Sequence, residues 1–373
     1  MSRSGVSPAD LDSCSPAAPV NASWQAAVLT SGRWLVIILG LGCASLLVLI
    51  VSLRFGAETV GFSEILRILL LALQNERAGL ESAGAVGVIM LQVRLPRVIL
   101  AFLVGGCLAT IGAGLQALLR NPLADPYVLG ISSGAAFGAA LAMLLGIGTS
   151  LFAVSALPLC AFLGGLLSIL VVYRITISYG YLPVHTLLLT GVILNAIFSA
   201  LIMFITSMMD PNRSFGMMTW LMGTLTAPDY PTLGVLAVYF VLGMLVLFSQ
   251  ARSLNLLTLG EEAARALGVE VETVKRTVFF AAALMVGAIV SVSGMIGFIG
   301  MVVPHAVRMV HGPDHRLLLP ASALAGGSFL VAADTVARTL LAPAEIPVGV
   351  VTALAGGPFF IYLLVARKGR LAV

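Results

Sequence analysis

Residues 34–53 read WLVIILGLGCASLLVLIVSL, a run of twenty residues without a charged side chain. The hydrocarbon core of a bilayer is about 30 Å thick, and a helix of about 20 apolar residues is needed to cross it. A continuous apolar segment of this length is typical of a membrane span and longer than the apolar stretch of an ordinary buried helix. The run therefore predicts a transmembrane helix.

The composition extends this prediction to the whole chain. Only 10% of the 373 residues are charged, whereas a soluble globular protein carries about 25%. Apolar types make up 60% even before the 39 glycines are counted. One water-soluble core cannot bury so much apolar surface. The net charge of +4 comes without a basic run interleaved with aromatic residues, so a nucleic-acid partner is not predicted.

Nine further apolar runs follow the first. They lie near residues 96–119, 127–147, 151–173, 185–207, 233–250, 276–294, 296–311, 318–340 and 349–366. The sequence thus predicts an all-α polytopic membrane protein with about ten transmembrane helices in residues 34–373. Residues 1–33 hold scattered Pro, Ser and Asp with no apolar core, which predicts a disordered cytoplasmic tail rather than a cleaved signal peptide.

Lysine and arginine are distributed unevenly between the two sides of this topology. With the N-terminus inside, the predicted cytoplasmic segments hold 13 of these residues and the outer segments hold seven. This excess favours cytoplasmic N- and C-termini. Arg94 and Arg97 fall on the outer side and need a separate explanation.

The sequence contains no pattern that predicts covalent chemistry. No Gly-rich loop ends in a lysine that would hold a nucleotide phosphate. No cluster of His, Cys, Asp or Glu has metal-ligand spacing, and no nucleophile has a partner base. We therefore predict no catalytic residue, metal site or cofactor in this chain. Transport is the leading class of function.

The segment LGEEAARALG, residues 259–268, lies in a predicted cytoplasmic loop. Its glycines bracket a short helix with Glu261 and Glu262 in the first turn and Arg265 in the last, which suits the helix macrodipole. The small side chains on one face would fit a cleft of another protein. An amphipathic connector between two spans is the alternative interpretation.

Several longer motifs accompany this segment. They are RLPR at 94–97, RNPLADP at 120–126, LGISSGA at 129–135, GFIG at 297–300 followed by PH at 304–305 and Arg308, DHR at 314–316, Ala333-Asp334 with Arg338, and EIPVG at 345–349 with Pro358. Together they resemble the FecCD-type permease subunits of ATP-binding-cassette (ABC) importers for ferric siderophores, haem and vitamin B12. The resemblance runs from about residue 35 to the C-terminus.

The resemblance implies an architecture and a set of partners. Such permeases are homodimers of ten-helix subunits, the type II importer architecture, in the bacterial inner membrane. Two ATPase subunits, which hold ATP and Mg, sit on the cytoplasmic face, and a soluble or lipid-anchored substrate-binding protein docks on the outer face. The expected cargo is a ferric chelate, either a siderophore or haem, with vitamin B12 as the alternative. The sequence does not choose among these cargoes.

The resemblance also implies roles for individual residues at both faces. The helix that couples the permease to the ATPase would comprise Gly260, Glu261, Glu262, Ala263, Arg265, Leu267 and Gly268. Arg94, Arg97 and Arg338 would receive acidic residues of the binding protein. Arg338 also lies four residues after Asp334, so an ion pair within one helix is an alternative or additional role.

Two further groups concern the transport pathway. The cytoplasmic gate positions of the family correspond to Asn121, Leu123, Val184 and His185. A histidine at the last position would contact haem iron or cap a helix. Small and polar stripes that would line the pathway are formed by Gly191, Asn195 and Ser199 in one helix and by Thr352 and Gly356 in another. Helix packing is the alternative role for such stripes.

An ion-coupled secondary transporter is the rival from another class. It would need acidic residues inside the membrane as proton or sodium sites. Asp334 is nearly the only candidate, and its place near an outer helix end with Arg338 in reach argues against a proton relay.

Overall fold

The computed structural model describes residues 29–56, 59–74, 84–147, 156–178 and 180–371. Within these ranges, ten helices correspond to the ten predicted spans. They are α1 (Ser31–Arg54), α5 (Leu95–Leu118), α6 (Ile131–Leu144), α7 (Ala156–Thr176), α8 (Val184–Ser207), α10 (Tyr230–Ser249), α13 (Val271–Ser293), α14 (Ile299–His311), α15 (His315–Thr339) and α16 (Val348–Leu371). The predicted all-α membrane fold is confirmed. Of the predicted tail, residues 1–28 lie outside the described residues.

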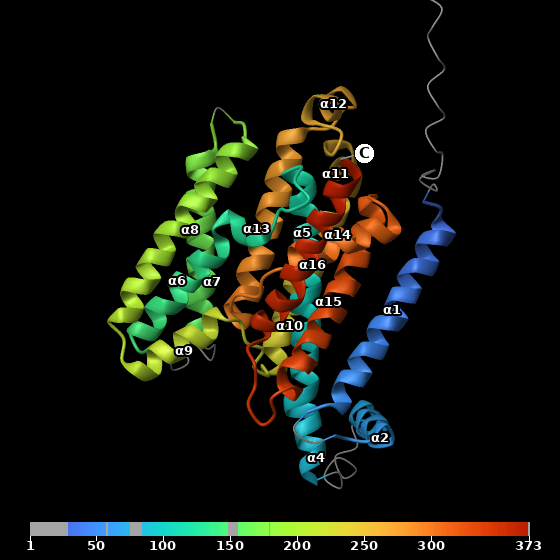
Figure 1. The fold of residues 1–373 in the computed structure, drawn as a ribbon, viewed down its shortest axis with the longest axis vertical. Helices are drawn as coiled ribbons and strands as arrows, with labels where there is room; N and C mark the ends of the chain where they lie inside the picture. The colour runs from blue at the N-terminus through green and yellow to red at the C-terminus, as the bar shows by residue number, and fades with distance from the viewer. Residues whose placement is uncertain (1–28, 57–58, 75–83, 148–155, 179, 372–373) are drawn as a thin grey trace, which may run out of the picture.

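Shorter helical elements connect these ten. They are α2 (Phe62–Leu73), α4 (Gly84–Ile89), the π-helical turn η2 (Met90–Arg94), the 3-10 turn η3 (Pro126–Leu129), α9 (Pro211–Leu221), α11 (Ala251–Leu257) and α12 (Glu261–Ala266). In Figure 1, α12 lies at the end of the bundle where α1 begins and α16 ends, whereas α2 and α4 lie at the opposite end. We call these the inner and outer ends.

Two of the ten helices are shorter than predicted. Residues 126–129 form η3 rather than the start of a span, and Gly130 with φ 81° separates it from α6, which has only 14 residues. Phe298 has φ 70°, so α14 begins only after it and has 13 residues. At about 1.5 Å per residue, neither helix is long enough to cross the hydrocarbon core alone. Seven helical segments of the described chain are long and apolar enough to do so.

Helix α5 forms the centre of the bundle and packs against α10, α13, α14 and α15. In the apolar part of residues 84–118, 83% of the side chains are buried, whereas in α1 only 11% are. Glycines bring the helix backbones together: a Cβ on Gly112 would lie 1.8 Å from the carbonyl oxygen of Gly300. Close approach of this kind is typical of helix packing in membranes. The exposed apolar side of α1 suits contact with lipid.

Candidate functional site

Helix α12 projects from the inner end of the bundle (Figure 1). It begins after Gly260, whose φ of 115° few other residues adopt, and the chain turns again at Gly268 with φ 83°. Of its six residues only Ala264 is buried. The flanking Leu259 and Leu267 are 66% and 60% exposed. The short helix predicted at residues 260–268 is therefore present, and it presents small and apolar side chains to the exterior.

A group of five charged residues, which we call the inner cluster, holds the base of α12. Lys275 of α13 is at its centre: its Nζ lies 2.8 Å from Glu261 Oε2 and 3.1 Å from Glu272 Oε1, and its side chain is 3% exposed. Arg265 lies 3.5 Å from each of the two carboxylates. Arg120, after α5, completes the cluster with Nη2 3.9 Å from Glu261 Oε1. Lys275 is one of the 13 cationic residues of the predicted cytoplasmic segments, and its role in this cluster was not predicted, although Glu272 three residues earlier is a local signal.

The two predicted gate segments both lie beside the inner cluster. Asn121 follows Arg120 directly, and its Oδ1 accepts a hydrogen bond of 2.9 Å from the backbone N–H of Leu123. On the other side, the backbone N–H of Leu182 donates to Glu272 Oε2 at 2.7 Å, just before α8 begins at Val184. His185 is exposed. Gating by these four residues stays a prediction.

The structure also corrects one interpretation of His185. Capping a helix was the simpler of the two roles considered for this side chain. The N-cap of α8 is Pro183, and no side chain bonds to the first turn there. His185 therefore does not cap α8, because it already lies inside the helix.

The DHR motif fixes α11, the helix that leads to α12, against α15. Asp314 caps α15 by accepting from the backbone N–H of Arg316 at 3.0 Å, and Asn255 of α11 donates to the same carboxylate at 2.8 Å. Burial alone would raise the pKa of Asp314, but hydrogen bonds from Arg316 and Asn255 outweigh it and lower the pKa to about 2. The carboxylate is thus charged and bonded at neutral pH.

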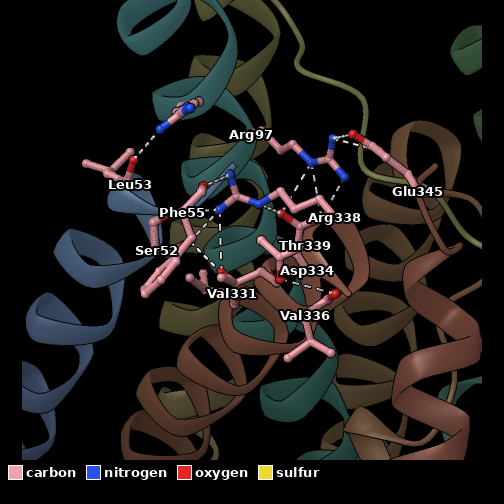
Figure 2. A network of polar contacts seen from close by, with 12 residues as sticks. Ser52, Leu53, Phe55, Arg97, Val331, Asp334, Val336, Arg338, Thr339 and Glu345 are labelled. Carbon is pink, nitrogen blue, oxygen red and sulfur yellow. Dashed lines mark hydrogen bonds and ion pairs between the residues drawn. The ribbon is translucent and has the colours of Figure 1, made fainter. Parts of the chain in front are cut away.

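At the outer end, a second group of five charged residues forms what we call the outer cluster (Figure 2). It consists of Arg94, Arg97, Asp334, Arg338 and Glu345. Arg97 bridges the two carboxylates, with Nη2 2.9 Å from Asp334 and Nη1 3.0 Å from Glu345. Arg338 Nε lies 3.3 Å from the other oxygen of Asp334, which is 1% exposed. The ion pair predicted between Asp334 and Arg338 is present.

The remaining donors of the outer cluster bind the C-terminal end of α1. Arg338 donates to the carbonyl oxygens of Ser52 and Phe55, each at 2.9 Å. Arg94 donates to that of Leu53 at 3.1 Å. The last carbonyls of a helix lack the regular donor four residues on, and a cation is favourable at the negative end of the helix macrodipole. The arginines thus hold α1 onto the bundle.

This geometry bears on the predicted docking of a binding protein. Arg94 and Arg338 are each 7% exposed and donate within the chain. Arg97, with a side chain 14% exposed, borders a hollow of about 410 Å³ that also reaches Glu345 and the threonines at 219, 224 and 226. Docking at the three arginines stays a prediction, and Arg97 is the one that opens to a hollow.

The predicted pathway stripes are mostly covered in this structure. A Cβ on Gly191 would lie 2.3 Å from the carbonyl oxygen of Val128, and Asn195 donates to that of Tyr127 at 2.9 Å. These contacts hold η3 against α8, as the packing alternative expected. Ser199 is exposed.

The stripe of α16 is covered in the same way. Thr352 has no exposed surface, and its hydroxyl donates to the carbonyl of Gly349 at 3.0 Å. A Cβ on Gly356 would lie 2.6 Å from the Cβ of Phe298. A lining role for these positions stays a prediction and requires the helices to separate.

Comparison with known proteins finds relatives of this chain. Over 76% of the chain and 75% of the relative, it is 46% identical to the cobalamin import system permease BtuC of Halobacterium salinarum. It is 43% identical to the hemin transport system permease HmuU of Yersinia pestis over 75% of the chain and 84% of that protein. A solved inward-facing structure of an ABC transporter assigned to the metal-chelate type aligns with a TM-score of 0.74 and 32% identity, covering 89% of this chain and 99% of that one.

The family model agrees with these relatives. The model of the FecCD transport family matches residues 44–366, from the middle of α1 to the last turns of α16. The match includes α12, the inner cluster and the outer cluster. The chain belongs to the FecCD transport family and is a multi-pass ABC importer permease.

Proposed function

We propose that two copies of this chain form the membrane pathway of an importer that carries a metal chelate across the cytoplasmic membrane. A separate ATPase subunit, with ATP and Mg, binds at α12 on the cytoplasmic side and supplies the energy. A substrate-binding protein delivers the chelate at the outer end. The observation that carries the proposal is α12, an exposed helix fixed at its base by a buried lysine.

The surface of α12 supports a protein partner. Leu259 and Leu267 stay exposed beside the small side chains of Ala263 and Ala266, and Glu262 adds one charge. This end lies beyond the apolar spans, so lipid does not cover it. A small apolar tip between two glycine turns fits a groove of a soluble subunit, and a nucleotide-hydrolysing partner is required because the sequence has no phosphate-binding loop of its own.

For the cargo we propose a ferric chelate, haem or a siderophore, with a corrinoid as the second candidate. Identity to a hemin permease supports the first, and slightly higher identity to a cobalamin permease supports the second. The solved relative of the metal-chelate type is compatible with both. All three cargoes are bulky metal chelates, which suits a wide pathway without a ring of charged side chains.

The environment of Asp334 supports ATP-driven over ion-driven transport. A proton or sodium site in a secondary transporter exchanges its ion with water as the protein alternates. Asp334 is 1% exposed and bound by two guanidinium groups, Arg97 and Arg338. Guanidinium groups thus lie against both oxygens of this carboxylate, at the positions that an exchanging cation would need.

Reconstitution tests the proposal. The chain is co-purified with a candidate ATPase and a candidate binding protein from the same genome and placed in liposomes. Uptake of labelled haem, ferrichrome and cyanocobalamin is measured with ATP, with ADP and with an imposed proton gradient alone. We expect uptake of one of these chelates that requires ATP. Gradient-driven uptake without ATP would refute the proposal, and the chelate that competes best identifies the cargo.

A further inference from the structure

Glu261 is the first residue of α12, and each of its two carboxylate oxygens lies near a cationic group outside this helix. Its Oε2 lies 2.8 Å from Lys275 Nζ of α13, and its Oε1 lies 3.9 Å from Arg120 Nη2 at the end of α5. The side chain is 23% exposed, so water screens these pairs less than pairs on an open surface. One side chain of α12 therefore connects two different helices of the bundle.

Lys275 continues this connection toward the start of α8. An ammonium group has three donors, and here they face Glu261, Glu272 and the carbonyl oxygen of Leu182, the last at 3.4 Å. Glu272 accepts from the backbone N–H of Leu182 at 2.7 Å. The lysine and its neighbouring carboxylate thus hold both backbone groups of the residue that lies two positions before Val184.

Few other contacts hold α12. Only Ala264 among its residues is buried, and a glycine turn lies on each side of the helix. Packing alone therefore gives the helix little grip on the bundle. Besides the two pairs of Glu261, α12 makes one longer ionic contact with the bundle, from Arg265 to Glu272 at 3.5 Å. The shortest ionic contact through which a displacement imposed on α12 reaches the bundle is that of Glu261 with Lys275.

We propose that Glu261 and Lys275 are positioning residues that transmit the movement of α12 to both inner-end segments at once. One branch runs through Arg120 to Asn121 and Leu123, and the other runs through Lys275 and Leu182 to Val184 and His185. The inference rests on the proposed function, because it assumes that an ATPase moves α12. It assigns to the ion pairs of Glu261, which centre on the buried Lys275, a task that surface contact of α12 with the ATPase does not perform.

The principal test compares Glu261→Gln with Glu270→Gln in the reconstituted complex. The first substitution removes the charge from these ion pairs and keeps the shape of the side chain. The second makes the same change at an exposed residue of the neighbouring loop, for which the described chain shows no ion pair. We expect Glu261→Gln to lower chelate uptake per ATP hydrolysed about fivefold or more, the lower end of typical coupling between sites, with ATP hydrolysis retained. Glu270→Gln should match the wild type.

A double-mutant cycle distinguishes loss of the Glu261–Lys275 ion pair from general damage to the fold. Lys275→Met should lower uptake per ATP, and the double variant should be no worse than Glu261→Gln alone, because the branch through Lys275 begins at Glu261. Independent structural lesions would instead multiply. Equal uptake per ATP in Glu261→Gln and wild type, or multiplied losses in the double variant, would overturn the proposal.

A second readout observes the inner end directly. A spin label is placed at Thr186, an exposed residue in the first turn of α8, in a background with the four cysteines replaced by alanine. The distance between the labels of the two copies is measured with and without ATP. We expect a nucleotide-dependent change in the wild type and in Glu270→Gln, and its loss in Glu261→Gln. Retention of the full change in Glu261→Gln would contradict the transmission role.

Two outcomes keep this inference apart from the proposed function. If the wild-type chain neither binds the ATPase nor takes up a chelate with ATP, the proposed function fails first. If the wild type transports and Glu261→Gln does not insert, Arg120→Gln decides, since Arg120 is 45% exposed and its loss threatens folding least. Unchanged uptake per ATP in Arg120→Gln would overturn the claim that Glu261 drives both segments.

Discussion

The inner and outer clusters contain the same charges in different settings. Each has three cations and two carboxylates. At the outer end the ion pairs to Asp334 measure 2.9 and 3.3 Å, and this carboxylate is fully buried. At the inner end only Lys275 is buried, and the pairs made by Arg265 and Arg120 measure 3.5–3.9 Å with side chains about half exposed.

The other partners of the cations differ as well. In the outer cluster Arg94 and Arg338 also donate to backbone carbonyls of α1, which fixes a whole helix to the bundle. In the inner cluster Arg265 stays near solvent on α12, a helix of six residues. Short pairs with a buried partner fix an element to the bundle, as Asp334 does at the outer end and Lys275 does at the base of α12. The remaining pairs of α12 are longer and more exposed, and such pairs would allow the movement that we propose for this helix.

The largest loss of stability is expected from Asp334→Asn. This change leaves the buried guanidinium of Arg338 and the half-buried guanidinium of Arg97 without their shared carboxylate, and breaking a buried pair costs about 3–5 kcal/mol. Uptake per folded molecule should be retained, because the residue has no part in a relay. Thermal unfolding in detergent measures the first quantity and normalised uptake the second.

Asp229→Asn is the control, since Asp229 is exposed at the outer end and makes no capping bond in the described structure. If Asp334→Asn unfolds like the control, the outer cluster does not fix the bundle. If it abolishes uptake while unfolding normally, the proton-relay interpretation returns and the comparison of the two clusters fails.

A smaller loss is expected from Arg338→Gln. The change removes bonds from a charged donor to the end of α1, and a hydrogen bond to a charged group is worth about 1.5–3 kcal/mol. Asp334 keeps Arg97, so the buried carboxylate is not left unpaired. Hydrogen exchange should accelerate at the last turn of α1 more than in α5, while Arg67→Gln, an exposed change in α2, should leave both unchanged.

Equal acceleration in α1 and α5 would mean that Arg338 supports the whole bundle rather than the attachment of α1. The distinction is measurable because α1 is the least buried of the spanning helices and α5 the most.

The helices themselves were predictable from the sequence, because apolar runs of spanning length are a local property. All ten predicted spans have a helix. The predicted helix bounds were wrong at η3 and at Phe298, where positive φ values interrupt an apolar run. Apolar composition does not distinguish a broken helix from a continuous one.

The two clusters were predictable only in part, for the same reason. The pair of Asp334 with Arg338 is four residues apart and was found. The bonds from Arg94 and Arg338 to the end of α1 join residues 41 to 286 positions apart, and no local pattern announces them. Glu261 and Lys275 lie 14 positions apart with a turn between them, so their ion pair was not predicted, although α12 itself was.

A still smaller effect on stability is expected from Glu345→Gln, which tests docking. Glu345 is 55% exposed, and an exposed pair contributes under about 1 kcal/mol. Its removal frees one nitrogen of Arg97 beside the hollow. If acidic residues of a binding protein use this guanidinium, association should become faster and more dependent on salt, because such attraction is screened within about 8–10 Å.

Association kinetics at several salt concentrations measure this, with Glu64→Gln, an exposed change in α2, as the control. Rates and salt slopes equal to the wild type in both variants would leave Arg97 with a role inside the chain alone.

The smallest effect on stability is expected at the tip of α12, where Ala263→Trp places a bulky ring on an exposed position. Surface changes of this kind usually alter the free energy of unfolding by no more than about 0.5 kcal/mol. Association with the ATPase should nevertheless weaken and ATP-driven uptake should fall, because an indole does not fit where a methyl group did. The matched variant is Ala85→Trp, an exposed change in α4, a helix of six residues at the outer end, which should leave both properties unchanged. Normal assembly and ligand-stimulated ATP hydrolysis in Ala263→Trp would show that α12 is only a connector. Loss of transport without loss of stability is the reverse of the result expected for Asp334→Asn, and finding both would show that the outer end contributes mainly to stability and the inner end mainly to transport.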